Sequence, residues 1–301
     1  AQAILAQVLP SGQRSGIVAC KDMAEVNPNM QYESRPGGPA SSAGGGAKAS
    51  ENMKRLQAVL DRFEISIAEA NDLVVLQDYE VVIIADDSGS MQAAAEPAHT
   101  RQLGQQYRTR WEELKETVSE IVEIASCLDE TGVDVHFLNR PSVERVRHSG
   151  DSAFVKAFDP NPSGRTPLTE VLQRLRSRFT EAERPTLLFI LTDGEPNGGK
   201  HPFIREVTSI VKSARVRVQI MACTAEEDEI EWLNGLDKDL KEVDVTDDYY
   251  SEKQQVLKAG FATKFTRGDW CLKAMLGPIS HKFDQWDEKL KVPTCELCLI
   301  S

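Results

Sequence analysis

The clearest structural signal in this chain is an apolar run that ends abruptly in polar residues, Val81-Val82-Ile83-Ile84-Ala85-Asp86-Asp87-Ser88-Gly89-Ser90. The apolar half is typical of a strand that is buried on both faces of a sheet. The polar half then lies at the carboxyl end of that strand, where open α/β sheets bind their ligands. Asp86, Ser88 and Ser90 alternate with other residues, so three oxygen-bearing side chains can converge from one loop. Such oxygens suit Mg²⁺ or Mn²⁺.

Strands and helices alternate along the rest of the chain. We expect strands at 79–85, 133–138, 186–191, 216–222 and 242–245, with a short edge strand at 152–156. We expect helices at 110–127, 168–179, 203–214, 228–236 and 250–259, and a helical region at 270–290 that is interrupted at 277–278. This alternation predicts an α/β fold, with a Rossmann-like, open and mostly parallel sheet and helices on both faces.

Composition divides the chain into five parts. Residues 1–50 form a leader rich in Gly, Pro, Ser and Ala, with a short helix at 1–9. We expect the leader to be otherwise disordered, because it buries too little apolar surface to offset its ordering entropy. Residues 51–77 form an amphipathic helix and a linker: Ser50 can cap the helix, and apolar residues recur at helical spacing from Met53 to Ile67. The α/β domain covers 78–262, a helical extension 263–294, and a tail 295–301.

Two further polar loops are expected at the same edge of the sheet as Asp86, because parallel strands expose their carboxyl ends together. One is Gly164-Arg165-Thr166-Pro167, before a helix, and the other is Thr192-Asp193-Gly194-Glu195-Pro196, after a central strand. In these loops the chain resembles the von Willebrand factor type A domain with its metal-ion-dependent adhesion site. That site combines an Asp-x-Ser-x-Ser loop with a Thr and an Asp on two other loops. The five matching positions, in order, are Asp86, Ser88, Ser90, Thr166 and Asp193.

The resemblance covers roughly residues 78–262 and is closest to the intracellular eukaryotic type A proteins. It implies that Ser88, Ser90 and, in one state, Thr166 contact Mg²⁺ or Mn²⁺ directly, while Asp86 and Asp193 act largely through water. Neutral hydroxyls leave the cation poorly neutralised, so an acidic residue of a protein partner would complete the site. The implied function is a divalent-cation-dependent adhesion or scaffold module that is not an enzyme.

The plainer interpretation of Asp-x-Ser-x-Ser alone is a helix cap with a tight glycine turn. Asp87 and Glu195 lie next to the predicted ligands in the sequence, and we expect them to face solvent or to pair with a neighbour. Arg165 is expected to be a solvated loop cation.

Two enzymatic alternatives depend on the loop from Gly194 to Lys200. The loop nearly fits the phosphate-binding pattern G-x-x-x-x-G-K-[ST], but His201 stands where a metal-binding hydroxyl is needed. Pro196 and Pro202 also lack backbone donors. A metal-dependent hydrolase is the other alternative, with His201 as its general base. The sequence contains no nucleophile elbow, His-Glu-x-x-His or kinase signature.

Charge and cysteine usage limit the partners and the compartment. The net charge of −12 argues against nucleic acid as a partner, which needs a basic surface. No stretch approaches the roughly 18–20 apolar residues of a membrane span. Four cysteines are scattered singly, as is usual for intracellular thiols: Cys20, Cys127, Cys223 and Cys271. The only glycosylation sequon, at 161–163, is blocked by its proline. We therefore expect a cytoplasmic protein.

The sequence ends in Cys298-Leu299-Ile300-Ser301, a pattern typical of farnesylation. Cys298 is the candidate for the farnesyl group, and Cys295 is the candidate for a second, palmitoyl anchor, since one chain gives only marginal membrane binding. This interpretation predicts a peripheral protein at the cytoplasmic face of a membrane. The alternatives are an inert tail, or a Cys-x-x-Cys pair that forms half of a zinc site or a redox pair.

Overall fold

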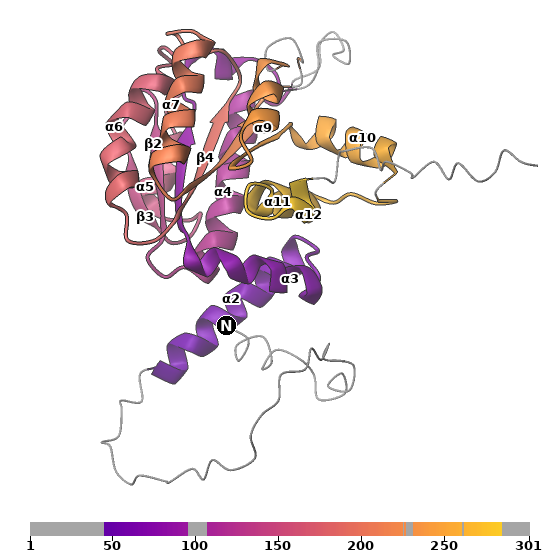
Figure 1. The fold of residues 1–301 in the computed structure, drawn as a ribbon. Helices are drawn as coiled ribbons and strands as arrows, with labels where there is room; N and C mark the ends of the chain where they lie inside the picture. Colours follow the sequence, from indigo (N-terminus) through magenta and orange to yellow (C-terminus); the bar gives the residue numbers. More distant parts are fainter. Residues whose placement is uncertain (1–44, 96–106, 225, 227–230, 261, 285–301) are drawn as a thin grey trace, which may run out of the picture. The chain divides into compact units, whose positions relative to one another are not determined.

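The computed structural model describes residues 45–95, 107–224, 226, 231–260 and 262–284 (Figure 1). The chain forms two compact units, Ala1–Ala58 and Val59–Ser301, and helix α2 (Gly45–Arg62) runs across their boundary. Predicted disorder is wrong for residues 45–50, because the helix begins five residues before its expected cap, Ser50. The predicted helix at 1–9, the rest of the leader, and the tail with Cys295 and Cys298 lie outside the described residues.

The second unit is built on a six-stranded sheet with the order β3-β2-β1-β4-β5-β6. Every neighbouring pair is parallel except β2 and the edge strand β3, which are antiparallel. The predicted fold class, an open and mostly parallel α/β sheet, is confirmed. The strands are β1 (Glu80–Ala85), β2 (Val133–Phe137), β3 (Val143–Val146), β4 (Thr186–Thr192), β5 (Val216–Ala222) and β6 (Val243–Thr246).

Helices cover both faces of this sheet (Figure 1). On one face Val82, Ile84, Leu188 and Ile190 share a hydrophobic core with helices α6 (Leu168–Glu181), α7 (Lys200–Ser213) and α9 (Asn234–Asp239). The residues between them in β1 and β4 point to the opposite face, because side chains alternate along a strand. That face is covered by helix α4 (Arg110–Leu128) and by α11 (Arg267–Leu276). The central strands are buried on both faces, as their apolar sequences predict.

We call the segment 86–90, with Ser88 and Ser90, the serine loop. The next α-helix, α4, forms almost where the sequence predicts it. Thr109 and Glu112 make a reciprocal capping box at its start. Its apolar residues repeat every three or four positions, and all of those predicted to face the core are buried: Trp111, Leu114, Val118, Ile121 and Ile124. Burial of this stripe against the sheet fixes where the first turn of α4 lies, at the carboxyl edge.

The predicted edge strand at 152–156 is wrong, since these residues begin helix α5 (Ser152–Phe158). The Asp151 side chain caps the helix by accepting a hydrogen bond from the backbone N–H of Ala153. Phe154 and Phe158, one turn apart, are both buried and pack edge to face. The true edge strand is β3, which the sequence analysis left unassigned.

The helix predicted to extend towards Ile67 ends at Arg62. Glu64 follows with a positive φ of 55°, which is incompatible with a continuing right-handed helix. Ser66 then caps a second helix, α3 (Ile67–Leu73), and leads into the 3₁₀ turn η1 (Val74–Asp78). Ile67 is therefore not on a buried stripe; its side chain is 40% exposed.

The C-terminal segment belongs to the same compact unit as the sheet. The 3₁₀ turn η4 (Glu231–Leu233) and α9 replace the single helix predicted at 228–236, of which 228–230 lie outside the described residues. Helix α10 (Tyr249–Ala259) is followed by α11, which starts three residues before the predicted region, and by α12 (His281–Asp284). None of the helices in the described ranges has the length and apolar character needed to cross a membrane.

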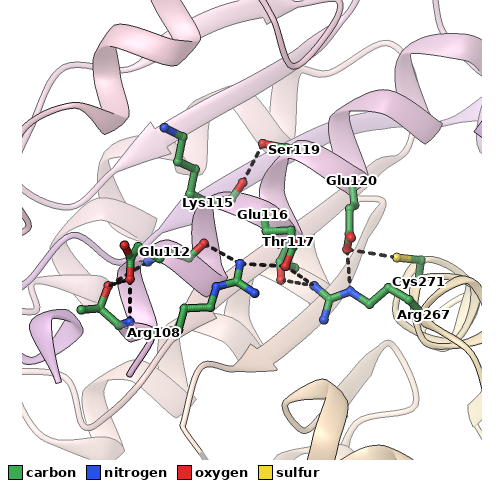
Figure 2. Close-up of polar contacts among 10 residues, drawn as sticks. Arg108, Glu112, Lys115, Glu116, Thr117, Ser119, Glu120, Arg267 and Cys271 are labelled. Carbon is green, nitrogen blue, oxygen red and sulfur yellow. Dashed lines mark hydrogen bonds and ion pairs between the residues drawn. The ribbon is translucent and has the colours of Figure 1, made fainter. Parts of the chain in front are cut away.

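Arg267, the first residue of helix α11, links this helix to α4 by hydrogen bonds (Figure 2). The Arg267 guanidinium donates to Glu120 Oε2 at 2.8 Å and to Thr117 Oγ1 at 3.0 Å. It also lies 4.3 Å from the centre of the Trp270 ring. Charge-assisted hydrogen bonds and ring stacking together orient one guanidinium closely, because both depend on its plane.

Candidate metal centre

The candidate site lies where the two central strands end side by side. Strands β1 and β4 pair in register, with Ala85 opposite Leu191. Asp86 comes directly after β1 and Asp193 directly after β4, and the Asp86 N–H donates to the carbonyl of Leu191 at 2.9 Å. The register of the sheet thus brings two carboxylates that are distant in sequence to the same edge.

The serine loop is held to Asp193 by a continuous series of hydrogen bonds. Asp86 Oδ1 accepts from the backbone N–H of Ser88 at 2.9 Å, which turns the chain back over the strand end. The hydroxyl oxygens of Ser88 and Ser90 are 3.0 Å apart. The Ser90 hydroxyl donates to Asp193 Oδ1 at 2.8 Å, and the Thr192 hydroxyl donates to Asp86 Oδ2 at 2.7 Å. Four of the five predicted ligands are therefore joined in one network.

The fifth predicted ligand, Thr166, faces the same space. A cavity of about 370 Å³ is lined by Ser90, Thr166 and Asp193, together with Arg110, Gly194, Glu195 and Lys200. The Thr166 backbone N–H donates to Asn197 Oδ1, and the Thr166 carbonyl accepts from the Asn197 N–H at 3.1 Å. Its hydroxyl makes no hydrogen bond with other described residues, so it is available to a ligand in the cavity.

Burial dominates the electrostatics of Asp86. Its side chain is inaccessible to solvent, and this burial raises the pKa of the carboxyl to about 6. The hydrogen bonds from Ser88 and Thr192 lower this pKa and the nearby Asp193 raises it, but burial is the largest cause. A charged carboxylate without water is costly unless a cation compensates it.

Arg110 supplies one such cation, but to the other carboxylate. It is the first residue of α4, and its Nη1 donates to Asp193 Oδ2 at 2.9 Å. The side chains of both residues are buried, at 6% and 1% exposure. Asp193 therefore accepts a serine hydroxyl on one oxygen and a guanidinium on the other.

The spacing of the hydroxyls fits a small octahedral cation. Two oxygens in adjacent positions around Mg²⁺, each about 2.1 Å from the metal, lie about 3.0 Å apart. The Ser88 and Ser90 oxygens have that separation. The described residues contain no cluster of three or more His, Cys, Asp or Glu side chains that could hold a metal. A cation at this edge would thus be held by hydroxyls and two carboxylates, which are hard ligands.

We expected Asp87 to face solvent or to pair with a neighbouring residue. It is buried and pairs with Arg140. Its carboxylate accepts from Arg140 Nε at 2.6 Å and from the backbone N–H of Asn139 at 2.8 Å. Arg140 also donates to the carbonyls of residues 157, 160 and 161, and it lies 4.8 Å from the centre of the Trp111 ring. Asp87 therefore joins the serine loop to the segment that leads to Thr166.

The other two neighbours lie closer to solvent. Glu195 pairs with Lys200 at 3.6 Å, and the two side chains are 52% and 38% exposed. Arg165 is exposed, as expected for a solvated loop cation. His201, the base required by the hydrolase alternative, is exposed and is not among the described residues that line the cavity.

The residues that hold the predicted ligands in place were not predicted from the sequence. They are Arg110, Asn139, Arg140, Thr192 and Asn197. An arginine in the first turn of an amphipathic helix usually faces solvent, so Arg110 gave no signal. Thr192 was recognisable in principle, because it occupies the last position of a buried strand beside a predicted ligand.

Comparisons with known proteins find a distant likeness. The sequence matches no protein-family model and no curated protein. Among solved structures, two of proximal thread matrix protein 1 from the mussel byssus are similar. They are 19% and 18% identical to this chain, with TM-scores of 0.38 and 0.36, and the second has zinc in its metal-ion-dependent adhesion site. Each match covers 60% of this chain and 46% of the mussel chain, so the chain spans less than half of that protein.

Proposed function

We propose that the chain is a divalent-cation-dependent protein-binding module rather than an enzyme. The observation that carries this proposal is the hydrogen-bonded network of Asp86, Ser88, Ser90 and Asp193, with Thr166 on the same cavity. Mg²⁺ or Mn²⁺ is the cation that these oxygens suit best. When bound, it would supply a positive charge to which a carboxylate of a partner protein could bind. We further propose that the protein acts in the cytoplasm.

The geometry of the Gly194–Lys200 loop disfavours the nucleotide alternative. A phosphate-binding loop needs free backbone N–H groups that point at the phosphates. Here Pro196 has none, the Asn197 N–H donates to the Thr166 carbonyl, and the Gly199 N–H donates to the Pro196 carbonyl. The loop instead supports Thr166, which favours a role in metal binding.

The first experiment measures cation binding directly. We predict that isothermal titration with Mn²⁺ gives one site per chain, and that Asp86→Asn weakens binding by about 10- to 100-fold. Asp159→Asn is the matched control, because Asp159 is an exposed carboxylate on a nearby loop. The proposal is wrong if the wild type takes up no Mn²⁺, or if both variants bind it equally well.

The second experiment tests protein binding. We predict that immobilised wild-type protein retains a defined set of proteins from a cytosolic extract in Mg²⁺, and that both EDTA and Asp86→Asn release the same set. Asp159→Asn should retain that set. Retention that is unchanged in EDTA would exclude a metal-bridged interaction.

A further inference from the structure

We propose that Asn197 is a positioning residue for Thr166 and that it thereby makes the metal centre select small cations over Ca²⁺. The inference rests on the proposed function and adds to it a determinant of cation size. The observation behind it is a reciprocal pair of hydrogen bonds. The Thr166 N–H donates to Asn197 Oδ1, and the Asn197 N–H donates to the Thr166 carbonyl at 3.1 Å.

Asn197 binds the peptide groups on both sides of Thr166 and not its side chain. The Thr166 carbonyl accepts a second hydrogen bond, from the Leu168 N–H at 2.9 Å. The Thr166 hydroxyl lies on the cavity that Ser90 and Asp193 also line. Asn197 therefore fixes the backbone of Thr166 and leaves its hydroxyl available to the site.

The loop after β4 sets the position of Asn197. The Gly199 N–H donates to the Pro196 carbonyl at 2.8 Å, which closes a turn around Asn197. Gly199 has a positive φ of 84°, which glycine adopts without strain, and α7 begins at the next residue. Asp193 lies in the same loop, directly after β4. This loop therefore supplies Asp193 to the site directly and holds Thr166 through Asn197.

Other contacts hold the residues before Thr166. The Gly89 N–H of the serine loop donates to the Gly164 carbonyl at 3.2 Å, and Asn139 Nδ2 donates to the Arg165 carbonyl at 2.8 Å. Thr166 is thus connected to the serine loop on one side and to the loop after β4 on the other. The second of these connections is the one that Asn197 makes.

Fixed spacing of the ligands favours a small cation. Mg²⁺ demands a nearly octahedral set of about six oxygens at about 2.1 Å, whereas Ca²⁺ accepts about six to eight at about 2.3–2.6 Å in flexible geometry. The Ser88 and Ser90 oxygens are 3.0 Å apart, which suits Mg²⁺. A larger ion requires Thr166 to move away from the serine loop. The hydrogen bonds to Asn197 oppose that movement.

The test is competition between cations on the full chain, in which Mg²⁺ or Ca²⁺ displaces bound Mn²⁺ in isothermal titrations. The wild type should bind Mg²⁺ about tenfold more tightly than Ca²⁺. Asn197→Ala should reduce this preference to about threefold or less, because Thr166 can then adjust to the larger ion. The substitution changes no charge, so electrostatic attraction for the two divalent ions stays the same.

Three further variants control the chemistry and the fold. Asn197→Asp keeps an oxygen acceptor for the Thr166 N–H, and its added charge acts on both ions alike, so it should keep the wild-type preference. Asn161→Ala changes an exposed asparagine close to Thr166 in the sequence and should also keep it. Asn197→Gln displaces the acceptor and should narrow the preference; it replaces Asn197→Ala if circular dichroism shows that variant to be unfolded.

The outcomes separate this inference from the function on which it rests. Absence of Mn²⁺ binding in the wild type would overturn the metal centre itself. Equal affinities of the wild type for Mg²⁺ and Ca²⁺ would overturn the role of Asn197 while the metal centre stands. The same conclusion follows if Asn197→Ala or Asn197→Gln weakens both ions by the same factor, or if Asn161→Ala narrows the preference as much, because Asn197 would then not set the cation size.

Discussion

His136 is a buried titratable residue on strand β2, away from the candidate metal centre. Its side chain is 7% exposed, and its Nε2 atom has no hydrogen-bond partner within the described part of the chain. Burial lowers the pKa of the imidazole, and the nearby Arg178 lowers it further. Asp134 and Glu144 oppose this shift, but their effect is smaller. The neutral ring is therefore the form that the folded protein favours.

This depressed pKa predicts a loss of stability in acid. The unfolded chain protonates His136 near its ordinary pKa of 6.5 and the folded protein only at lower pH. The contribution of His136 to the free energy of unfolding should therefore fall as the pH drops below 6.5, whereas the raised pKa of Asp86 acts in the opposite direction. Between pH 7.0 and 5.5, His136→Gln should therefore lose less stability, or gain more, than the wild type. Urea denaturation at pH 7.0 and 5.5 measures it. His148→Gln, at an exposed histidine, is the control; an equal loss in all three proteins would contradict the prediction.

At the scale of single residues, the sequence predicted those ligands whose positions follow from strand ends. Asp86, Ser88 and Ser90 come directly after a buried strand, and Asp193 follows its neighbour in the sheet. Arg110 and Asn197 could not be predicted in the same way. Their importance depends on which loop they meet in the folded protein, and nothing in the local pattern encodes that contact.

At the scale of elements, the Arg140 guanidinium links the serine loop to the segment 157–161 through hydrogen bonds. Arg140 binds Asp87 in the serine loop and three carbonyls of the 157–161 segment. The Ser163 N–H adds a bond to the Asp87 carbonyl at 2.8 Å, and the Gly89 N–H adds one to the Gly164 carbonyl at 3.2 Å. These contacts therefore fix the position of the serine loop relative to the loop at 164–167, which carries Thr166.

We predict that Arg140→Lys lowers the free energy of unfolding by about 1–3 kcal/mol, because a lysine ammonium cannot donate to Asp87 and to three separate carbonyls at once. Mn²⁺ affinity should fall with it, since the loops lose their common support. Arg165→Lys is the control, as the Arg165 side chain is exposed. Chemical denaturation and Mn²⁺ titration of both variants provide the measurements, and indistinguishable results for the two would refute the role of Arg140.

Element boundaries were predictable where apolar periodicity and caps agree. The helix at 110–128 and the strands β1, β4 and β5 lie within one residue of the predicted ranges. The segment 152–158 was not, because a short apolar run fits a strand as well as a helix. Asp151 caps this helix, and a predicted cap at Asp151 would have favoured a helix over an edge strand at 152–156.

At the scale of the whole second unit, its first described residues, from Val59 onward, pack against its last described residues, up to Asp284. Helix α11 approaches the turn after α2 so closely that a methyl group added at Gly268 would lie 1.9 Å from the Phe63 carbonyl oxygen. Ion pairs join the same segments at Lys264–Glu64 and Lys282–Asp72. The folded unit thus includes more than residues 78–262, the part that resembles a type A domain.

Gly268→Ala should therefore destabilise the protein, by about 1–3 kcal/mol or more, because a backbone atom must move to admit the methyl group. Gly235→Ala is the matched control: Gly235 also lies in a helix, and its added methyl would meet nothing within 4 Å. That substitution should be neutral or stabilising. Thermal melts compare the two, and a Gly268→Ala variant as stable as Gly235→Ala would contradict the close packing.

The sequence predicted the sheet because buried strands and amphipathic helices carry local signals. It did not predict that residues 59–78 and 262–284 meet, because a contact between segments some 200 residues apart leaves no such signal. Gly268 illustrates the difficulty, since a glycine in the first turn of a helix does not by itself indicate close packing.

Diffraction at the manganese absorption edge, from crystals grown in Mn²⁺, would locate the cation itself. We predict one anomalous peak within coordination distance of the Ser88 and Ser90 hydroxyl oxygens, on the side of the cavity that Thr166 and Asp193 line. The peak should be absent from crystals of Asp86→Asn. No peak beside the two serines at saturating Mn²⁺, or a peak only elsewhere on the molecule, would contradict the metal centre.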